Sequence, residues 1–122
     1  MRNNHEHDNQ VAVFKWAALN EKKWPELAVL YAIPNAAKRS PRLGAYMKAE
    51  GLRAGVPDIH LPVPRGTYAG LFVEMKAGKS KPTPSQNEWH ERLRVLGHRV
   101  EVCYGWPSAV NVIEKYLAGV KW

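Results

Sequence analysis

The sequence predicts an α/β fold in which a mixed central sheet is flanked by helices. Segments of helical and strand periodicity follow one another in the order α–β–α–β–β–α–β–α. Two of the strand segments alternate apolar and polar residues on either side of the turn-rich stretch 64–67, which indicates a hairpin. A last strand and helix follow, and they would add a parallel strand and a covering helix to that hairpin.

The first third of the chain predicts one helix and one strand. Asn3 or Asn4 is a suitable N-cap for a helix that runs to about Asn20. Residues 27–33 form an apolar run that predicts a strand buried on both faces, ended by Pro34. The helix is expected to bury an apolar stripe, with Trp16 to one side of it: Val11, Phe14 and Ala18.

The remaining helices and the last strand are expected around that hairpin. Residues 41–51 predict a short basic helix, and 78–84 predict a basic loop without regular structure. After that loop, Ser85 with Glu88 forms a capping-box pattern for a helix that ends at Gly97. Then come a strand over 99–104 and a helix over 107–118. The apolar positions expected to face the core are Trp89, Leu93 and Leu96 in the first of these helices and Val110, Ile113 and Leu117 in the second.

The hairpin segments place two acids and a lysine on one face. If the hairpin is symmetric about Gly66, Asp58 lies across from Glu74, and directly opposed residues have Cβ atoms about 5 Å apart. Lys76 follows Glu74 by two residues and so emerges on the same face. The other face is continuously apolar and suits a core: Ile59, Leu61, Val63, Leu71, Val73 and Met75.

This arrangement is typical of a site for a hard divalent cation. Two carboxylates that close repel each other, and one would stay protonated unless a cation lay between them. Oxygen ligands suit Mg²⁺ or Mn²⁺, which keep several waters and also bind phosphate oxygens. Lys76 would then position a water or stabilise charge on phosphorus. Alternatively, Glu74 forms a surface ion pair with Lys76 or Arg65, and Asp58 is a turn residue after proline.

Five short segments in this order resemble the PD-(D/E)xK nuclease superfamily, and within it the stand-alone viral or bacterial type of VRR-NUC (virus-type replication–repair nuclease) domain. The segments are Glu6–Gln10, Ala32–Asn35, Gly55–Asp58, Glu74–Lys76 and Ser85–Gln86. The resemblance covers essentially the whole chain, which implies a single nuclease domain over 1–122 with a restriction-endonuclease-like core. It implies metal-dependent cleavage of DNA phosphodiesters, often in branched or flapped DNA. Small stand-alone viral members act as dimers on four-way junctions.

The resemblance also implies roles for individual residues. Asp58 and Glu74 would be metal ligands, and Lys76 would be the catalytic lysine. Glu6 would be a third catalytic acid that reaches the metal from the first helix, and the carbonyl of Met75 would complete the coordination sphere.

Three amides would support this site. Gln10 lies one helical turn beyond Glu6, and Asn35 and Gln86 occupy positions that match the family's segments. Each amide has an alternative role in capping a helix or fixing a loop. Glu6 likewise has an alternative role as a capping-box residue three positions after Asn3.

The charge balance favours a polyanionic partner. The 122 residues carry a formal net charge of +7 and a pI of about 9.7. Basic residues flank both halves of the acidic pair, where a phosphate backbone would run. Those before Asp58 are Lys38, Arg39, Arg42, Lys48 and Arg53, and Lys79 and Lys81 follow Glu74. From these we expect Lys38, Arg39, Lys79 and Lys81 to bind nucleic acid.

Several other classes are disfavoured. No apolar run is long enough to span a bilayer, and the N-terminus lacks a signal-peptide apolar region, so we expect an intracellular protein, in the host cytoplasm if viral. Cys103 is the single cysteine, which excludes an internal disulfide, and its apolar surroundings predict a buried, inert thiol. The five histidines lack the spacing of a zinc site.

The predicted function is a Mg²⁺- or Mn²⁺-dependent DNA endonuclease. Because little chain lies beyond the catalytic core, we expect it to act as a homodimer on branched DNA such as Holliday junctions, without a small-molecule cofactor. Tyr116, Val120 and Trp122 either form dimer contacts or complete the core. The alternatives are a non-catalytic DNA-binding module and a nuclease subunit that depends on a helicase partner.

Overall fold

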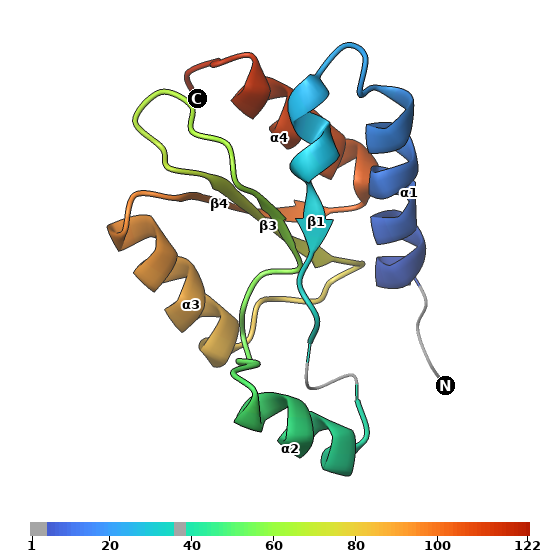
Figure 1. Cartoon of the computed structure of the whole chain (residues 1–122), viewed down its shortest axis with the longest axis vertical. Helices are drawn as coiled ribbons and strands as arrows, with labels where there is room; N and C mark the ends of the chain where they lie inside the picture. Colours follow the sequence, from blue (N-terminus) through green and yellow to red (C-terminus); the bar gives the residue numbers. More distant parts are fainter. Residues whose placement is uncertain (1–4, 36–38) are drawn as a thin grey trace.

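A computed structural model describes residues 5–35 and 39–122 of the chain. A four-stranded sheet in the order β1-β2-β3-β4 lies between two helical layers (Figure 1). The strands β1, β2 and β3 are antiparallel neighbours, and β4 runs parallel to β3, so the predicted mixed sheet is confirmed. The elements are α1 (His5–Leu19), the 3₁₀ helix η1 (Pro25–Val29), β1 (Tyr31–Ala32), α2 (Pro41–Ala49), β2 (Ile59–Leu61), β3 (Leu71–Lys76), α3 (Pro84–Val95), β4 (Arg99–Tyr104) and α4 (Trp106–Leu117).

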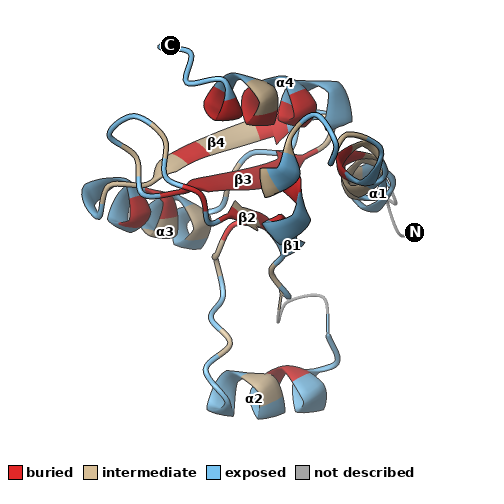
Figure 2. Cartoon of the chain, turned by 45° about the horizontal axis from the view of Figure 1, so that its top comes forward, coloured by how far each residue is buried: buried red, intermediate tan, exposed pale blue. Residues whose placement is uncertain are grey.

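The helices cover the two faces of the sheet unequally. Helices α1 and α4 lie over one face and enclose the main core, while α3 alone covers the other (Figure 2). Under α3 a smaller apolar cluster is formed by Phe72, Leu93 and Val100. Strand β3 is central and has helices on both sides, and all six of its residues are buried. Its charged residues are therefore held inside the protein.

The β2–β3 ribbon has the predicted register. Ile59 pairs with Val73 and Leu61 with Leu71, which centres the hairpin on Gly66. At its far end, two backbone hydrogen bonds of 3.0 and 2.9 Å join Arg65 and Tyr68 across a two-residue turn. All six apolar residues predicted for one face belong to the main core.

Helix α2 stands clear of this body. It lies at the end of two extended segments and makes few contacts with the rest of the described chain (Figures 1 and 2). Ser40 caps it by accepting a hydrogen bond from the Leu43 amide at 3.2 Å. Leu43 and Tyr46 remain exposed on its surface, at 44% and 67%.

Two expectations for the N-terminal third are wrong. The predicted strand over 27–33 is mostly the 3₁₀ helix η1, and only Tyr31 and Ala32 form a strand. Pro25 fixes the first turn of η1, and the local helical bonds from Leu27 and Leu30 take the place of strand pairing. In α1 the fully buried residues are Val13 and Ala17, because these positions face α4 and the sheet. Of the predicted stripe, Phe14 packs partly buried against the core, while Val11 and Ala18 are exposed, so this expectation is confirmed only for Phe14. The predicted N-caps Asn3 and Asn4 lie outside the described residues.

The start of α3 also differs from the prediction. Thr83 is the N-cap and Gln86 completes the capping box, so Ser85 and Glu88 do not have these roles. Leu96 is 72% exposed, while His90 is buried beside Leu93 on the face toward the sheet.

The C-terminal elements agree with the prediction over 99–104 and 107–118. Tyr116 completes the core, and its hydroxyl donates a 2.6 Å hydrogen bond to the carbonyl of Val63. Val120 and Trp122 remain partly exposed. No helix within the described ranges has the length and apolar character needed to cross a bilayer.

Candidate active site on the central ribbon

The register of the ribbon brings Asp58 opposite Glu74. Ile59 pairs with Val73, and one step further along the same antiparallel register Asp58 faces Glu74. Cβ atoms at such positions lie about 5 Å apart. Asp58 is fixed there because its Oδ2 accepts a 2.8 Å hydrogen bond from the Met75 amide. The two carboxylates are only 7% and 1% exposed, so the predicted acidic pair lies inside the protein.

The chain segment before Asp58 requires a glycine at position 55. Gly55 has φ +92°, and a Cβ added there would meet Ser85 Oγ at 2.5 Å and the Ser85 carbonyl oxygen at 2.7 Å. Ser85 Oγ in turn donates to the carbonyl of Ala54 at 3.4 Å. The segment before Asp58 therefore packs directly on the first turn of α3.

Side chains of helix α3 hold Glu74 on the face of the sheet that α3 covers. His90 Nε2 lies 3.1 Å from Glu74 Oε1, and Gln86 Nε2 donates to Glu74 Oε2 at 3.5 Å. Desolvation lowers the pKa of His90, the charges of Arg94 and Lys76 lower it further, and Asp58 opposes them. A neutral imidazole next to a carboxylate carries its proton on the nitrogen that faces it, so Nε2–H donates to Glu74.

Gln86 makes contacts that fit both of the roles considered for it. Its Oε1 accepts a 2.9 Å hydrogen bond from the Thr83 amide, which closes the capping box, while its Nε2 reaches Glu74. The start of α3 is thereby coupled to the acidic pair.

Lys76 belongs to the same cluster of charges. It is 7% exposed on β3, two residues beyond Glu74, and its charge lowers the pKa of His90. The pKa of His90 responds to Lys76 and Asp58 together, and His90 contacts Glu74 directly. Asp58 accepts from the Met75 amide, between Glu74 and Lys76, so the three residues lie close together at this end of the ribbon, and their shared catalytic role stays a prediction.

A cleft opens beside Asp58, between α1 and the chain that follows β1. Its volume is about 710 Å³, and its lining includes four predicted residues: Gln10, Asn35, Arg39 and Asp58. His7 and Lys15 add further basic character to its wall. The carboxylate of Asp58 thus lies where a ligand in a basic cleft would meet the acidic pair.

Comparisons with known proteins identify the family of this chain. Residues 1–107 match the model of the VRR-NUC domain family. The chain belongs to the VRR-NUC family. Two solved structures are similar: a "VRR_NUC domain protein", with TM-score 0.78 and 29% identity over 100% of this chain and 99% of that one, and a "VRR_NUC domain", with TM-score 0.53 and 28% identity over 88% and 97%.

A phage protein is similar over a shorter stretch. It is named "Putative nuclease p44", from Acyrthosiphon pisum secondary endosymbiont phage 1, and is 47% identical over 58 residues. The match spans 48% of this chain and 60% of the length of that relative.

The remaining predicted site residues are Glu6, Lys79, Lys81 and Lys38. Glu6 is half-buried on α1 and is not among the residues that line the cleft. Among the described residues, no three His, Cys, Asp or Glu side chains form a group that could hold a metal. Lys79 and Lys81 are exposed on the loop after β3. Lys38 lies outside the described residues.

The donor set nevertheless suits a hard dication. Mg²⁺ is commonly held by one or two carboxylates together with waters and substrate phosphates, and Asp58 with Glu74 offers such a pair. The Met75 amide points to Asp58, and the amide and carbonyl of a strand residue face the same neighbour, so the Met75 carbonyl is directed to the same side.

The prediction from sequence missed His90. Its position could have been found from helix spacing, because it follows Gln86 by four residues and so shares its face. The prediction also missed Lys15 on the cleft wall. Lys15 follows Gln10 by five residues, a spacing that does not predict a shared helix face.

Proposed function

We propose that this protein is a Mg²⁺- or Mn²⁺-dependent DNA endonuclease that hydrolyses phosphodiester bonds, with residues 1–122 forming a single VRR-NUC nuclease domain. The observation that carries the proposal is the opposition of Asp58 and Glu74 beside a buried Lys76. Acidic and basic side chains are seldom fully buried without a purpose or a partner. Three of them on one strand pair are costly to keep if the protein only binds DNA through its surface.

The metal would be held by Asp58, Glu74 and the carbonyl of Met75. Glu6 would be the third acid, supplied by the first helix. When bound, the dication would polarise the phosphodiester and make a water more acidic.

The protein's own residues would orient the reacting groups. His90 and Gln86 hold the Glu74 carboxylate by two hydrogen bonds, so it needs no reorientation when substrate arrives. Lys76 would hold the attacking water or stabilise negative charge on phosphorus. Gln10 and Asn35 would support the site from the wall of the cleft beside Asp58.

The DNA strand would run through the cleft. Arg39 and Lys15 on its wall can pair with phosphates next to Asp58. Lys79 and Lys81, exposed on the loop after β3, and Lys38 would extend this basic track.

We further propose that the protein acts as a homodimer on branched DNA such as a Holliday junction. No element of the described fold is placed as a groove-reading helix on a dedicated module, so selection would come from the spacing of two sites. Helix α2 supports this proposal, because it projects from the body with Leu43 and Tyr46 exposed. A second copy would cover these side chains.

The acidic pair is tested by Asp58→Asn and Glu74→Gln. Each change preserves shape but removes a charge that the dication requires, so cleavage of a four-way junction in Mn²⁺ should fall by more than about 100-fold. Thermal unfolding followed by circular dichroism checks that the variants remain folded. Wild-type cleavage by either folded variant would overturn the catalytic assignment.

The substrate is tested with a panel of four-way junction, flap, single strand and linear duplex, with and without EDTA. We expect cleavage that is lost in EDTA and is fastest on a branched substrate. Binding without cleavage in every case would favour a non-catalytic DNA-binding module, and cleavage that appears only with an added helicase would favour a dependent subunit. Light scattering of wild type and Leu43→Glu tests the dimer, which the charge should dissociate.

A further inference from the structure

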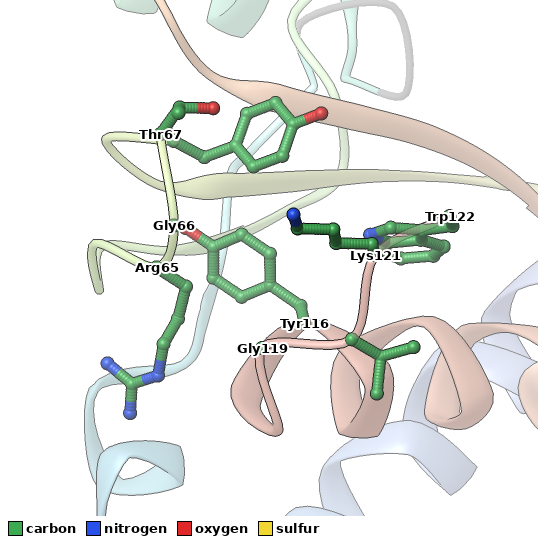
Figure 3. Close-up of a pocket in the computed structure, with 9 residues that line it drawn as sticks. Arg65, Gly66, Thr67, Tyr116, Gly119, Lys121 and Trp122 are labelled. Carbon is green, nitrogen blue, oxygen red and sulfur yellow. The ribbon is translucent and has the colours of Figure 1, made fainter.

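The ribbon carries a second cavity at its turn end, remote from the acidic pair. Its volume is about 360 Å³, and it lies between the Arg65–Tyr68 turn and the residues that follow α4 (Figure 3). Residues 116–122 form one of its sides and lie beyond the family match, which ends at residue 107. The turn residues on its other side, Arg65 to Tyr68, lie within that match.

Three aromatic rings shape this cavity. Tyr116 is buried, and its ring centroid is 6.4 Å from that of Tyr68. Trp122 also lines the cavity and is still 44% exposed. Arg99 holds two of these rings, because its guanidinium lies 3.9 Å from the centre of the Trp122 ring and its Nη1 donates to the Tyr68 hydroxyl at 3.0 Å. These contacts hold the Trp122 and Tyr68 rings beside the cavity.

Basic side chains surround the rings. Figure 3 shows Arg65 on one side of Tyr116 and Lys121 with Trp122 on the other. Arg65 is held by Glu26 and by a 3.1 Å hydrogen bond to the Leu117 carbonyl, so it also ties the turn to the end of α4. Lys115 adds a further positive charge 6.0 Å from the Trp122 ring.

We propose that this aromatic pocket binds an unpaired nucleotide of the DNA substrate, with the base against the Tyr68 and Trp122 rings and the adjoining phosphate near Lys121. Rigid aromatic rings in a positively charged setting are how proteins hold single strands without reading sequence. The cavity is at the small end of the range for ligand pockets, which suits one base with its sugar and excludes a duplex. This proposal rests on the proposed nuclease function for its source of DNA.

The spacing along the ribbon fits a strand that reaches both sites. Arg65 is seven positions after Asp58, which at about 3.3 Å per residue is about 23 Å of extended chain. A DNA strand rises about 3.4 Å per nucleotide, so the pocket would hold a base about seven nucleotides from the cleaved bond. A substrate with an unpaired arm would therefore gain a contact that a fully paired junction lacks.

The test measures binding in EDTA, where cleavage is silent, so failure of the nuclease proposal cannot be mistaken for failure of this one. The probes are a six-nucleotide thymidine strand, an abasic strand with the same number of phosphates, a blunt duplex, and thymidine monophosphate. Trp122→Ala should weaken binding of the thymidine strand by at least about fivefold and leave binding of the abasic strand and the duplex unchanged. Trp122→Phe keeps a ring and should restore most of the affinity.

Two controls define the other outcomes. Leu96→Ala removes an apolar side chain that is 72% exposed just beyond the end of α3, outside the pocket, and this variant should bind all probes like wild type. If Trp122→Ala lost as much affinity for the abasic strand as for the thymidine strand, or lost no affinity at all, the proposal that a base stacks in the pocket would be overturned. Thymidine monophosphate that binds as tightly as the strand, or a change of oligomeric state in Trp122→Ala, would show another occupant and also overturn the proposal.

Discussion

At one end of the β2–β3 ribbon, Asp58 faces Glu74 beneath α3, while at the other end Arg65 and Tyr68 close a turn beside Tyr116. The acidic end is deeply buried and its side chains are held by directed hydrogen bonds from Met75, Gln86 and His90. The turn end is built from aromatic rings and from cations that rest on them. One ribbon thus presents two kinds of surface, one at each of its ends.

The difference suggests a division of work between the ends. Groups held rigidly in a dry environment suit chemistry, because their orientation costs nothing during the reaction. Rings that remain partly exposed suit reversible contact with a strand. If this division is correct, changes at the acidic end should alter reaction rate, and changes at the turn end should alter binding or stability.

Outside the acidic pair itself, the largest effect in this comparison is expected from His90→Ala. The change removes the donor to Glu74 Oε1, and partners of this kind behind metal ligands are worth about 10- to 100-fold in activity or metal affinity. Stability should fall by about 1–3 kcal/mol, because a buried acceptor loses a partner. Cleavage rates measured against Mn²⁺ concentration separate a metal effect from a folding effect. His90→Gln keeps an N–H donor and should recover part of the loss.

If the cleavage rate of His90→Ala depended on Mn²⁺ concentration as in wild type, the proposal that α3 orients Glu74 for catalysis would be wrong. The control is Leu96→Ala, on the exposed side of the chain just beyond α3, which should change neither rate nor metal dependence.

A smaller effect is expected at the turn end from Tyr116→Phe. The hydroxyl donates a 2.6 Å hydrogen bond to the Val63 carbonyl from a buried position, and its loss should cost about 1 kcal/mol of stability. Urea unfolding at neutral pH measures it. Burial raises the pKa of Tyr116, so the unfolded tyrosine loses its proton first as the pH rises, and wild-type stability should fall above about pH 10. The phenylalanine variant should lack that alkaline loss, and identical curves for the two proteins would contradict this account.

The ribbon could be predicted from sequence because its evidence is local. Strand alternation fixed which side chains share a face, and the symmetric turn fixed the register of Asp58 against Glu74. Strand β4 and helix α4 were equally well predicted, because their apolar residues follow a single period.

The wrong predictions concern segments whose partners are distant in sequence. Helix α1 packs on both α4 and the sheet, and this selects Val13 and Ala17 over the stripe that contains Val11. The apolar run 27–33 satisfies either a strand or a 3₁₀ helix, and only tertiary packing decides between them. His90 was missed for the same reason, since its partner Glu74 lies on another element.

The smallest effect at neutral pH concerns Cys103, which lies on β4 next to Met75 and beneath the acidic end. Burial raises the pKa of its thiol to about 11, from an ordinary value of 9.0. The unfolded thiol ionises at lower pH, so the unfolded state loses its proton first and stability should fall as the pH rises from about 9 through 11. At about pH 8 a thiol reagent should label the native protein slowly and the urea-unfolded protein fast. Rapid native labelling would mean that the apolar side of the acidic end opens to water, and the contrast between a rigid acidic end and an accessible turn end would then be lost.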